Sequence, residues 1–489
     1  MEGIEFPLGV ALVVYVVFMF ALSWFARTKI DTAEDYIVAG RRLPFSLATA
    51  TLFATWFGAG TLMATSDEVR ANGLANTLLE PYGPGICLIL AGILYARPLW
   101  EAKILTLYDY YRARFGRTAE IIGSLYAISF FGWIATQFVG AAGIIETFYD
   151  DLDRRTAILL VAGVAGGYTL VGGMWSVTLT DAVQLILLVF GLALLGWNVF
   201  AHFGDGSPVS GVAEILTQTP NETLVIFPAE KMEQLWSSLG LLLSGTIGLI
   251  PSQDLLQRVF SSRSSRVAQG ACIFSGTLYL VLGSMPVLFG LAARLLWGPD
   301  SIADGDSTFV IPRLAKTFLT PLGQAVTITF ILCVLSTILS TIDSAILAPS
   351  SVLAQNLLHP LSRGRLSVLG MTQVNVVIVT IISVALALSG ERLFSLLEGS
   401  YSLPIPSLVV LTFALYQRRP HPLPAACVLS FGLIAWIAEQ VGTYFGYDIQ
   451  DFVPLPLPVW TTAGSIVLYV LLDRLVKLGR PNEPMIEGP

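Results

Sequence analysis

The chain has 489 residues, of which 54% are apolar and only 12% are charged. Soluble domains carry about 25% charged residues, so this composition excludes an ordinary soluble protein and indicates one that crosses a membrane many times. The formal net charge is −7, and no basic patch suggests a nucleic-acid partner. The expected partners are the lipid bilayer, ions and a small solute.

The apolar segments predict an all-α polytopic protein with about thirteen transmembrane helices, because each span needs about 20 apolar residues. The predicted spans are 6–26, 44–67, 77–99, 121–148, 156–172, 177–201, 235–252, 269–296, 321–356, 366–388, 393–416, 422–444 and 458–476. No separate soluble domain is predicted, so residues 1–489 form a single transmembrane domain.

Lys and Arg gather in alternate connections between the spans, and this asymmetry predicts the orientation of the chain. The run 257–266, with Arg258, Arg263 and Arg266, is interpreted as one of these basic cytoplasmic loops. The pattern places the N-terminus outside and the C-terminus in the cytoplasm. We therefore expect a multi-pass protein of the plasma membrane.

Two of the predicted spans contain helix breakers near their middle. The second span carries Gly58 and Gly60, and the seventh carries Gly245, Gly248 and Pro251. Such residues are tolerated inside a membrane where neighbouring helices re-satisfy the freed backbone groups. Two broken spans, five spans apart, point to a transporter site at the interface of two inverted repeats.

The ninth predicted span is unusually rich in oxygen-bearing side chains. It carries Ser336, Thr337, Ser340, Thr341, Asp343 and Ser344. The hydroxyls fall three and four residues apart, so they share one helix face. That face must meet protein or water, because a carboxylate costs about 2.5–3.5 kcal/mol at a helix centre. Any single hydroxyl is explained by close helix packing, but the Ser340–Thr341 pair beside Asp343 favours a site of hard oxygen ligands for Na⁺.

Four segments together resemble the sodium:solute symporter family. They are 52–61, 170–184, 255–263 and 339–351, and they follow one another in the family's order over most of the chain. The resemblance implies a leucine-transporter-like fold of five plus five inverted spans. The first repeat is then 44–201, the second 235–416, and the helices of 422–476 are peripheral. It also implies sodium-driven uptake of a small organic solute by alternating access, with Na⁺ as the coupling ion.

The resemblance further implies where the main sodium ion binds. In the family this site combines backbone carbonyls of the first broken helix with carbonyl and hydroxyl groups of the ninth span. The matching positions here are Ala54, Phe57, Thr337, Ser340 and Thr341. Both hydroxyl positions of the Ser340–Thr341 pair are filled.

Some members of the family use a second cation site, for which this chain also has matching residues. Asp181 matches the carboxylate of that site, and Asp343 with Ser344 matches its hydroxyl pair, although Asp343 adds a charge. Two neighbouring carboxylates favour either a second sodium ion or a shared proton. The alternative for Asp181 is a buried carboxylate capped by Ser and Thr.

The nearest resemblance within the family is to its choline-transporter branch, which holds a quaternary ammonium in an aromatic cage by cation–π contacts. Trp56 and Trp133 match two of the cage tryptophans. Ser252 stands where the third tryptophan is expected, and Pro84 lies near the position of a cage tyrosine. Half of the cage is therefore missing, and packing is the alternative role for either tryptophan.

Three further polar residues are candidates for binding the substrate. Glu80 lies near the outer start of the third span and either pairs with a substrate amine or is an exposed interfacial carboxylate. Gln137 is a candidate hydrogen-bonding group, and Thr61 follows the break in the second span.

No enzymatic constellation is visible, since His202, His359 and His421 all lie in loops or at span ends. The prediction is therefore a transporter and not an enzyme. A proton-coupled symporter of the same fold and a non-transporting solute sensor are the alternatives. The expected assembly is a monomer or a weak homo-oligomer.

Overall fold

The computed structural model describes the chain except for residues 1–3, 150–151, 300–308, 363–364, 390–392, 446, 448–452 and 480–489. Within the described residues the regular structure is helical, apart from one isolated bridge between Leu43 and Ser262. The principal helices are α1 (Glu5–Arg27), α3 (Phe45–Trp56), α4 (Thr65–Asn72), α5 (Tyr82–Leu90), α9 (Ser129–Phe148), α10 (Arg154–Phe203), α12 (Met232–Gly245), α13 (Gln253–Ser261), α14 (Ser265–Trp297), α16 (Gln324–Val352), α18 (Val368–Ala387), α19 (Leu393–Ser402), α20 (Ile405–Tyr416), α21 (Pro422–Tyr444) and α22 (Leu457–Gly479).

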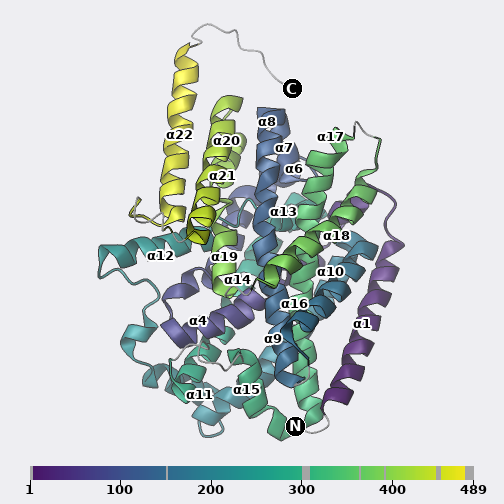
Figure 1. The fold of residues 1–489 in the computed structure, drawn as a ribbon, viewed down its shortest axis with the longest axis vertical. Coiled ribbons are helices and arrows are strands. Elements are labelled where there is room, and N and C mark those ends of the chain that lie inside the picture. Colours follow the sequence, from purple (N-terminus) through teal and green to yellow (C-terminus); the bar gives the residue numbers. More distant parts are fainter. Residues whose placement is uncertain are drawn as a thin grey trace.

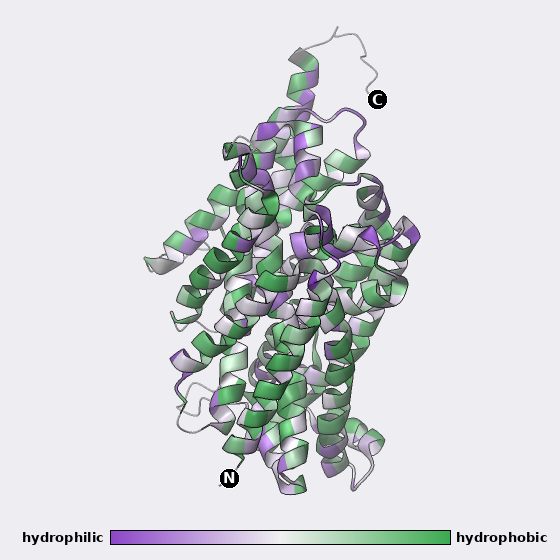
Figure 2. Ribbon diagram, turned by 90° about the vertical axis from the view of Figure 1, so that its right-hand side faces the viewer, coloured by the Kyte–Doolittle hydropathy of each residue, from purple (hydrophilic) through white to green (hydrophobic). Residues whose placement is uncertain are grey.

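The described part of the chain contains ten helices long and apolar enough to cross a membrane, or eleven if the bent pair Phe45–Trp56 and Gly60–Asn72 counts as one span. In Figure 2 the long helices are mainly green, and purple segments gather in the connections. The all-α polytopic prediction is confirmed, whereas the count of about thirteen spans stays a prediction. Part of the difference lies in α10, whose 50 residues cover two predicted spans and bend at Gly173.

The break expected in the second span is present. Helix α3 ends at Trp56, and the chain resumes as a π-helical turn over Gly60–Ala64 that leads into α4. The two halves of this span meet at an angle of 57°.

The break expected in the seventh span is also present. Helix α12 ends at Gly245, α13 begins at Gln253, and residues 246–252 between them are not helical. Both breaks lie against the helix that carries the hydroxyl-rich face, since α16 contacts α3 and α13.

Helix α16 is the central element of the molecule. Every residue from Cys333 to Val352 is buried, and a helix that is buried all round belongs in the core. It packs against α3, α9, α10, α13 and α18, and Figure 1 shows it running through the middle of the bundle. The polar face predicted for the ninth span therefore meets protein, as the cost of exposing it to lipid requires.

The N-terminal end of α1 and the C-terminal end of α22 lie at opposite ends of the long axis in Figure 1. This arrangement is the one that an odd number of spans produces. Which end faces the cytoplasm stays a prediction from the loop charges.

The basic loop predicted at 257–266 is wrong in its first half. Residues 257–261 belong to α13, and Arg258 is 0% exposed. Its guanidinium donates to the Asp254 carbonyl (3.1 Å) and to Ser344 Oγ (2.5 Å). Arg258 is thus an internal charge of the bundle and gives no information on which side of the membrane the segment lies.

Candidate functional site

The break after α3 frees a backbone carbonyl that the hydroxyl pair of α16 meets. In an unbroken helix the Gly58 amide would donate to Ala54, but here it donates to the Trp56 carbonyl at 2.9 Å. Ser340 Oγ and Thr341 Oγ1 each donate to the Ala54 carbonyl oxygen at 3.2 Å. The family resemblance implies that these three groups share one site, and the structure brings them into contact.

The remaining residues predicted for the sodium site lie on either side of this contact. The Thr337 carbonyl accepts from Ser340 Oγ at 2.7 Å, while Thr337 Oγ1 donates to Cys333 at 2.8 Å within its own helix. Phe57 stands in the break itself, with φ −78° and ψ 72°. Its ring stacks on Phe53 at a centroid distance of 5.0 Å, so only its backbone is available to an ion.

The amide of Gln137 caps the second half of the broken helix. Gln137 Oε1 accepts from the Ala59 amide at 2.7 Å, and Gln137 Nε2 is buried without a hydrogen-bond partner. A Cβ at Gly58 would overlap both Gln137 Oε1 and Thr341 Oγ1. Glycine is therefore required where the break approaches α9 and α16 this closely.

A charged cluster, which we define as Asp181, Arg258, Asp343 and Ser344, lies beside the hydroxyl pair. Thr51 Oγ1 of α3 donates to Asp181 Oδ2 at 2.5 Å, and Arg258 of α13 donates to Ser344 Oγ. The guanidinium interacts electrostatically with both carboxylates of the cluster. All four residues are 0% exposed.

The charged cluster still has unused acceptors. Asp181 Oδ1 and Asp343 Oδ2 are buried and find no hydrogen-bond partner among the described residues, although buried polar groups are nearly always paired. Asp343 Oδ1 is 3.4 Å from Ser344 Oγ. The Arg258 guanidinium interacts with three carboxylates, those of Asp181, Asp254 and Asp343, so this arrangement suits a further proton or a small cation.

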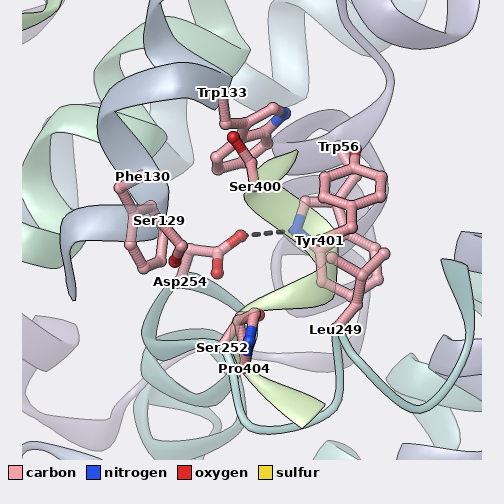
Figure 3. Close-up of a pocket in the computed structure, with 10 residues that line it drawn as sticks. All are labelled: Trp56, Ser129, Phe130, Trp133, Leu249, Ser252, Asp254, Ser400, Tyr401 and Pro404. Atoms are coloured by element: carbon pink, nitrogen blue, oxygen red, sulfur yellow. Dashed lines mark hydrogen bonds between the residues drawn. The ribbon is translucent and has the colours of Figure 1, made fainter. Parts of the chain in front are cut away.

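A small pocket with a cavity volume of about 20 Å³ lies between the two broken spans. It is lined by Trp56, Ser129, Phe130, Trp133, Leu249, Ser252, Asp254, Ser400, Tyr401 and Pro404. These residues come from the end of α3, from α9, from the break before α13 and its first turn, and from the end of α19 and the turn that leads into α20. Figure 3 shows their side chains gathered around one space.

The pocket combines aromatic rings with one carboxylate. Trp56, Phe130, Trp133 and Tyr401 supply the rings. The carboxylate is Asp254, whose Oδ2 accepts from the Trp56 indole N–H, drawn as the dashed line in Figure 3. Aromatic faces and a carboxylate both attract a cation.

Of the six residues predicted to bind substrate, three line this pocket and three do not. Trp56, Trp133 and Ser252 line it. Thr61, Glu80 and Gln137 lie outside the lining and support the broken helix. Ser252 lines the pocket where the third cage tryptophan was expected, but its side chain is a small hydroxyl group. Tyr401 of α19 supplies part of the missing aromatic surface.

The interpretation of Glu80 as an exposed interfacial carboxylate is wrong. Glu80 is 2% exposed and accepts from Tyr401 Oη (2.8 Å), Thr61 Oγ1 (3.3 Å) and Tyr279 Oη (3.4 Å). Tyr279 Oη also donates to the Trp56 carbonyl at 3.0 Å. This network ties the first break to Tyr401 of the pocket.

Sequence reasoning missed Asp254, Arg258 and Tyr401 as site residues. Asp254 follows Pro251 and Ser252 at the second break, and a carboxylate at that place in an apolar span was a usable signal. Arg258 was hidden by the assumption that basic residues mark loops. Tyr401 precedes Pro404, where α19 and α20 are interrupted, a break that was not predicted.

Comparison with known proteins gives consistent matches. The model of the sodium:solute symporter family matches residues 36–421. High-affinity choline transporter 1 of Drosophila melanogaster is 26% identical over 397 residues, which cover 78% of this chain and 62% of the relative. The sodium/pantothenate symporter of Haemophilus influenzae is 27% identical over 366 residues, with 73% and 72% covered. The chain thus spans less than two thirds of the Drosophila relative.

Solved structures show the same fold. The substrate-bound outward-open structure of a Na⁺-coupled sialic acid symporter has a TM-score of 0.76 at 18% identity, covering 96% of this chain and 98% of that chain. MhsT in complex with L-phenylalanine has a TM-score of 0.53 at 15% identity, with 88% and 98% covered. These matches confirm the leucine-transporter-like architecture, and the relatives are transporters, not enzymes.

Proposed function

Because the chain belongs to the sodium:solute symporter family, we propose that it is a sodium-coupled symporter that imports a small organic cation by alternating access. The observation that carries this proposal is the arrangement around the first break. On one side the Ala54 carbonyl meets the α16 hydroxyls, and on the other Trp56 closes a pocket with Asp254.

Sodium binds at the first break in this proposal. Ala54 and Phe57 contribute carbonyl oxygens, and Thr337, Ser340 and Thr341 contribute carbonyl or hydroxyl oxygens. These are hard oxygen ligands, which suit Na⁺ and not a transition metal. The two hydroxyls already point at the Ala54 carbonyl, so a small ion drawn between them would join α3 to α16.

Coupling follows from the shared backbone of the break. An ion that holds Ala54 and Phe57 also orders Trp56 between them, and Trp56 positions Asp254 in the pocket. A ligand shifts a conformational equilibrium only through its different affinity for the two states. Sodium therefore favours the state in which the pocket is formed, and the substrate favours the state in which sodium is held.

The charged cluster is proposed as a second cation or proton site. Support comes from Asp181 Oδ1 and Asp343 Oδ2, the buried acceptors without partners. A proton or a small cation bound there would reduce the excess of negative charge, because Asp181, Asp343 and Asp254 share one guanidinium.

The protein is proposed to lie in the plasma membrane with its N-terminus outside and its C-terminus in the cytoplasm. The loop charges support this orientation. An inside-negative potential then contributes about 2.3 kcal/mol per 100 mV for each positive charge that moves inward. A monomer is sufficient for the mechanism, because the ion and pocket residues belong to one chain.

The test is uptake by purified protein in proteoliposomes, with radiolabelled organic cations, amino acids and neutral metabolites, under imposed sodium or proton gradients. We expect an organic cation to accumulate only when sodium is directed inward. Accumulation of neutral or anionic solutes alone would exclude the proposed substrate class. Accumulation driven by protons without sodium would exclude the proposed ion.

A further inference from the structure

We propose that the substrate is a protonated amine that keeps at least one N–H, not a quaternary ammonium. This inference rests on the proposed function and narrows its substrate class. The inference rests on Asp254, which provides a directional hydrogen-bond acceptor in a pocket rich in aromatic side chains.

The carboxylate of Asp254 is fixed through one oxygen and keeps room for a further donor at the other. Oδ2 accepts from the Trp56 indole N–H. Oδ1 is buried in a side chain that is 0% exposed and forms no well-aligned hydrogen bond among the described residues, while the Ser252 hydroxyl and the Leu255 amide lie beside the carboxylate. In Figure 3 the carboxylate points into the space among the lining side chains.

A second polar group lies beside this carboxylate. Ser252 lines the pocket, its hydroxyl interacts with Asp254, and its oxygen accepts from no donor among the described residues. A buried acceptor that lacks a donor is costly, so the missing donors are expected from the substrate. An ammonium N–H supplies such donors, whereas a trimethylammonium group has none.

The charge of the pocket points in the same direction. Among the described residues, the lining contains one carboxylate and no Lys, Arg or His. Arg258, on the same helix as Asp254, donates to the Asp254 carbonyl and to Ser344, and it interacts electrostatically with Asp181, Asp254 and Asp343. Three buried carboxylates therefore share one guanidinium, and a cationic amine in the pocket would balance part of the excess negative charge.

The aromatic walls alone do not distinguish these cations. Cation–π attraction acts on methylated and unmethylated ammonium groups alike. Discrimination comes from the hydrogen bond, because a site built to bind an N–H strongly rejects the analogue that lacks it. We expect affinity to fall at least about tenfold when the last N–H is replaced by methyl.

The experiment uses methylation series on a fixed carbon skeleton. One series runs from 2-aminoethanol through its N-methyl and N,N-dimethyl forms to choline, and parallel series start from butylamine and benzylamine. Binding to the purified full chain is measured by calorimetry in saturating sodium chloride. The dissociation constant should change little over the early methylations and rise about tenfold or more at the last one.

Variants of Asp254 separate the hydrogen bond from simple crowding. In Asp254→Leu the step at the last methylation should shrink to less than about threefold, because no acceptor is left to reject the quaternary form. A clash with the third methyl would instead leave the step in place. Glu101→Gln removes an exposed carboxylate that pairs with Arg97 at 2.9 Å far from the lining, and it should keep the wild-type step.

The methylation series measured on the wild-type protein tests the inference even if Asp254→Leu does not fold. If the quaternary form binds as tightly as its dimethyl partner in every series, the inference is overturned while organic-cation symport stands. If no amine binds and uptake is confined to neutral or anionic solutes, the inference and the proposed function both fail.

Discussion

The hydroxyl pair of α16 gives the sharpest prediction for the ion site. Ser340 Oγ and Thr341 Oγ1 both lie 3.2 Å from the Ala54 carbonyl oxygen. Ser340→Ala and Thr341→Val each remove one oxygen and keep nearly all of the side-chain volume. The packing of α16 against α3 should therefore survive while the ion loses a ligand.

The expected magnitude follows from the burial of this contact. Both hydroxyls are 0% exposed, so no water from bulk replaces the lost oxygen. Removing one partner of a buried polar group costs about 1–3 kcal/mol, which is about a five- to 150-fold weaker sodium affinity. The Ala54 carbonyl keeps the other hydroxyl in each single variant, so we expect the lower end of this range, and a larger loss in the double variant.

The assay is equilibrium binding of ²²Na⁺ to purified protein, with potassium chloride keeping the ionic strength constant. Ser350→Ala is the matched control, since Ser350 is buried on the same helix and its hydroxyl donates only to Ile346 at 2.6 Å. The control should keep the wild-type midpoint. Unchanged midpoints in Ser340→Ala and Thr341→Val would show that the pair only packs α16 against α3.

Three further predictions concern the neighbouring groups. Asp181→Asn and Asp343→Asn should each alter the pH dependence or the ion stoichiometry of uptake more than they alter substrate affinity. Flux measurements at several pH values check this. Unaltered ion dependence in both variants would exclude the second cation or proton site. Trp56→Leu should raise the dissociation constant of a cationic substrate, measured by calorimetry, by about two- to thirtyfold. Trp56→Phe should lose less affinity, because an aromatic ring remains. Equal affinity in the wild type and Trp56→Leu would show that Trp56 is only a packing residue. Gly58→Ala should abolish sodium-dependent uptake, because the added Cβ would overlap Thr341 Oγ1. The control Gly163→Ala should transport normally, since a Cβ there meets nothing within 4 Å. Uptake by Gly58→Ala at the wild-type rate would contradict the close approach of the first break to α16.

Sequence alone predicted the parts of the fold that follow from local chemistry. Helix-breaking residues predicted both discontinuities: Gly58 lies just after the end of α3, and Pro251 lies just before the start of α13. The spacing of the hydroxyls predicted that their face of the ninth span meets protein, and in the structure the whole of α16 from Cys333 to Val352 is buried. The Ser340–Thr341 contact with Ala54 was anticipated by the family resemblance, because the first break and the ninth span carry the family's motifs.

The composition of the pocket was less predictable, because it depends on packing between distant segments. Tyr401 lies far along the chain from Trp56, and the contacts of α19 with α9 and with the Gly60–Ala64 turn bring the two residues to one space. Arg258 was assigned to a loop because loop charges and buried counter-ions look alike in sequence. Glu80 was taken for an interfacial carboxylate because the tyrosines that bury it, Tyr279 and Tyr401, come from other helices.

The central claim is that the ion and the organic cation meet across one break in the second span. The most direct test is a pair of titrations on purified protein: the dissociation constant of the best-binding cation at several sodium concentrations, and the sodium midpoint at several concentrations of that cation. Because coupling between two bound ligands is reciprocal, saturating either ligand should tighten the other by the same factor, and Ser340→Ala with Thr341→Val should remove this effect. A sodium midpoint that does not move when the cation saturates its site would contradict the account.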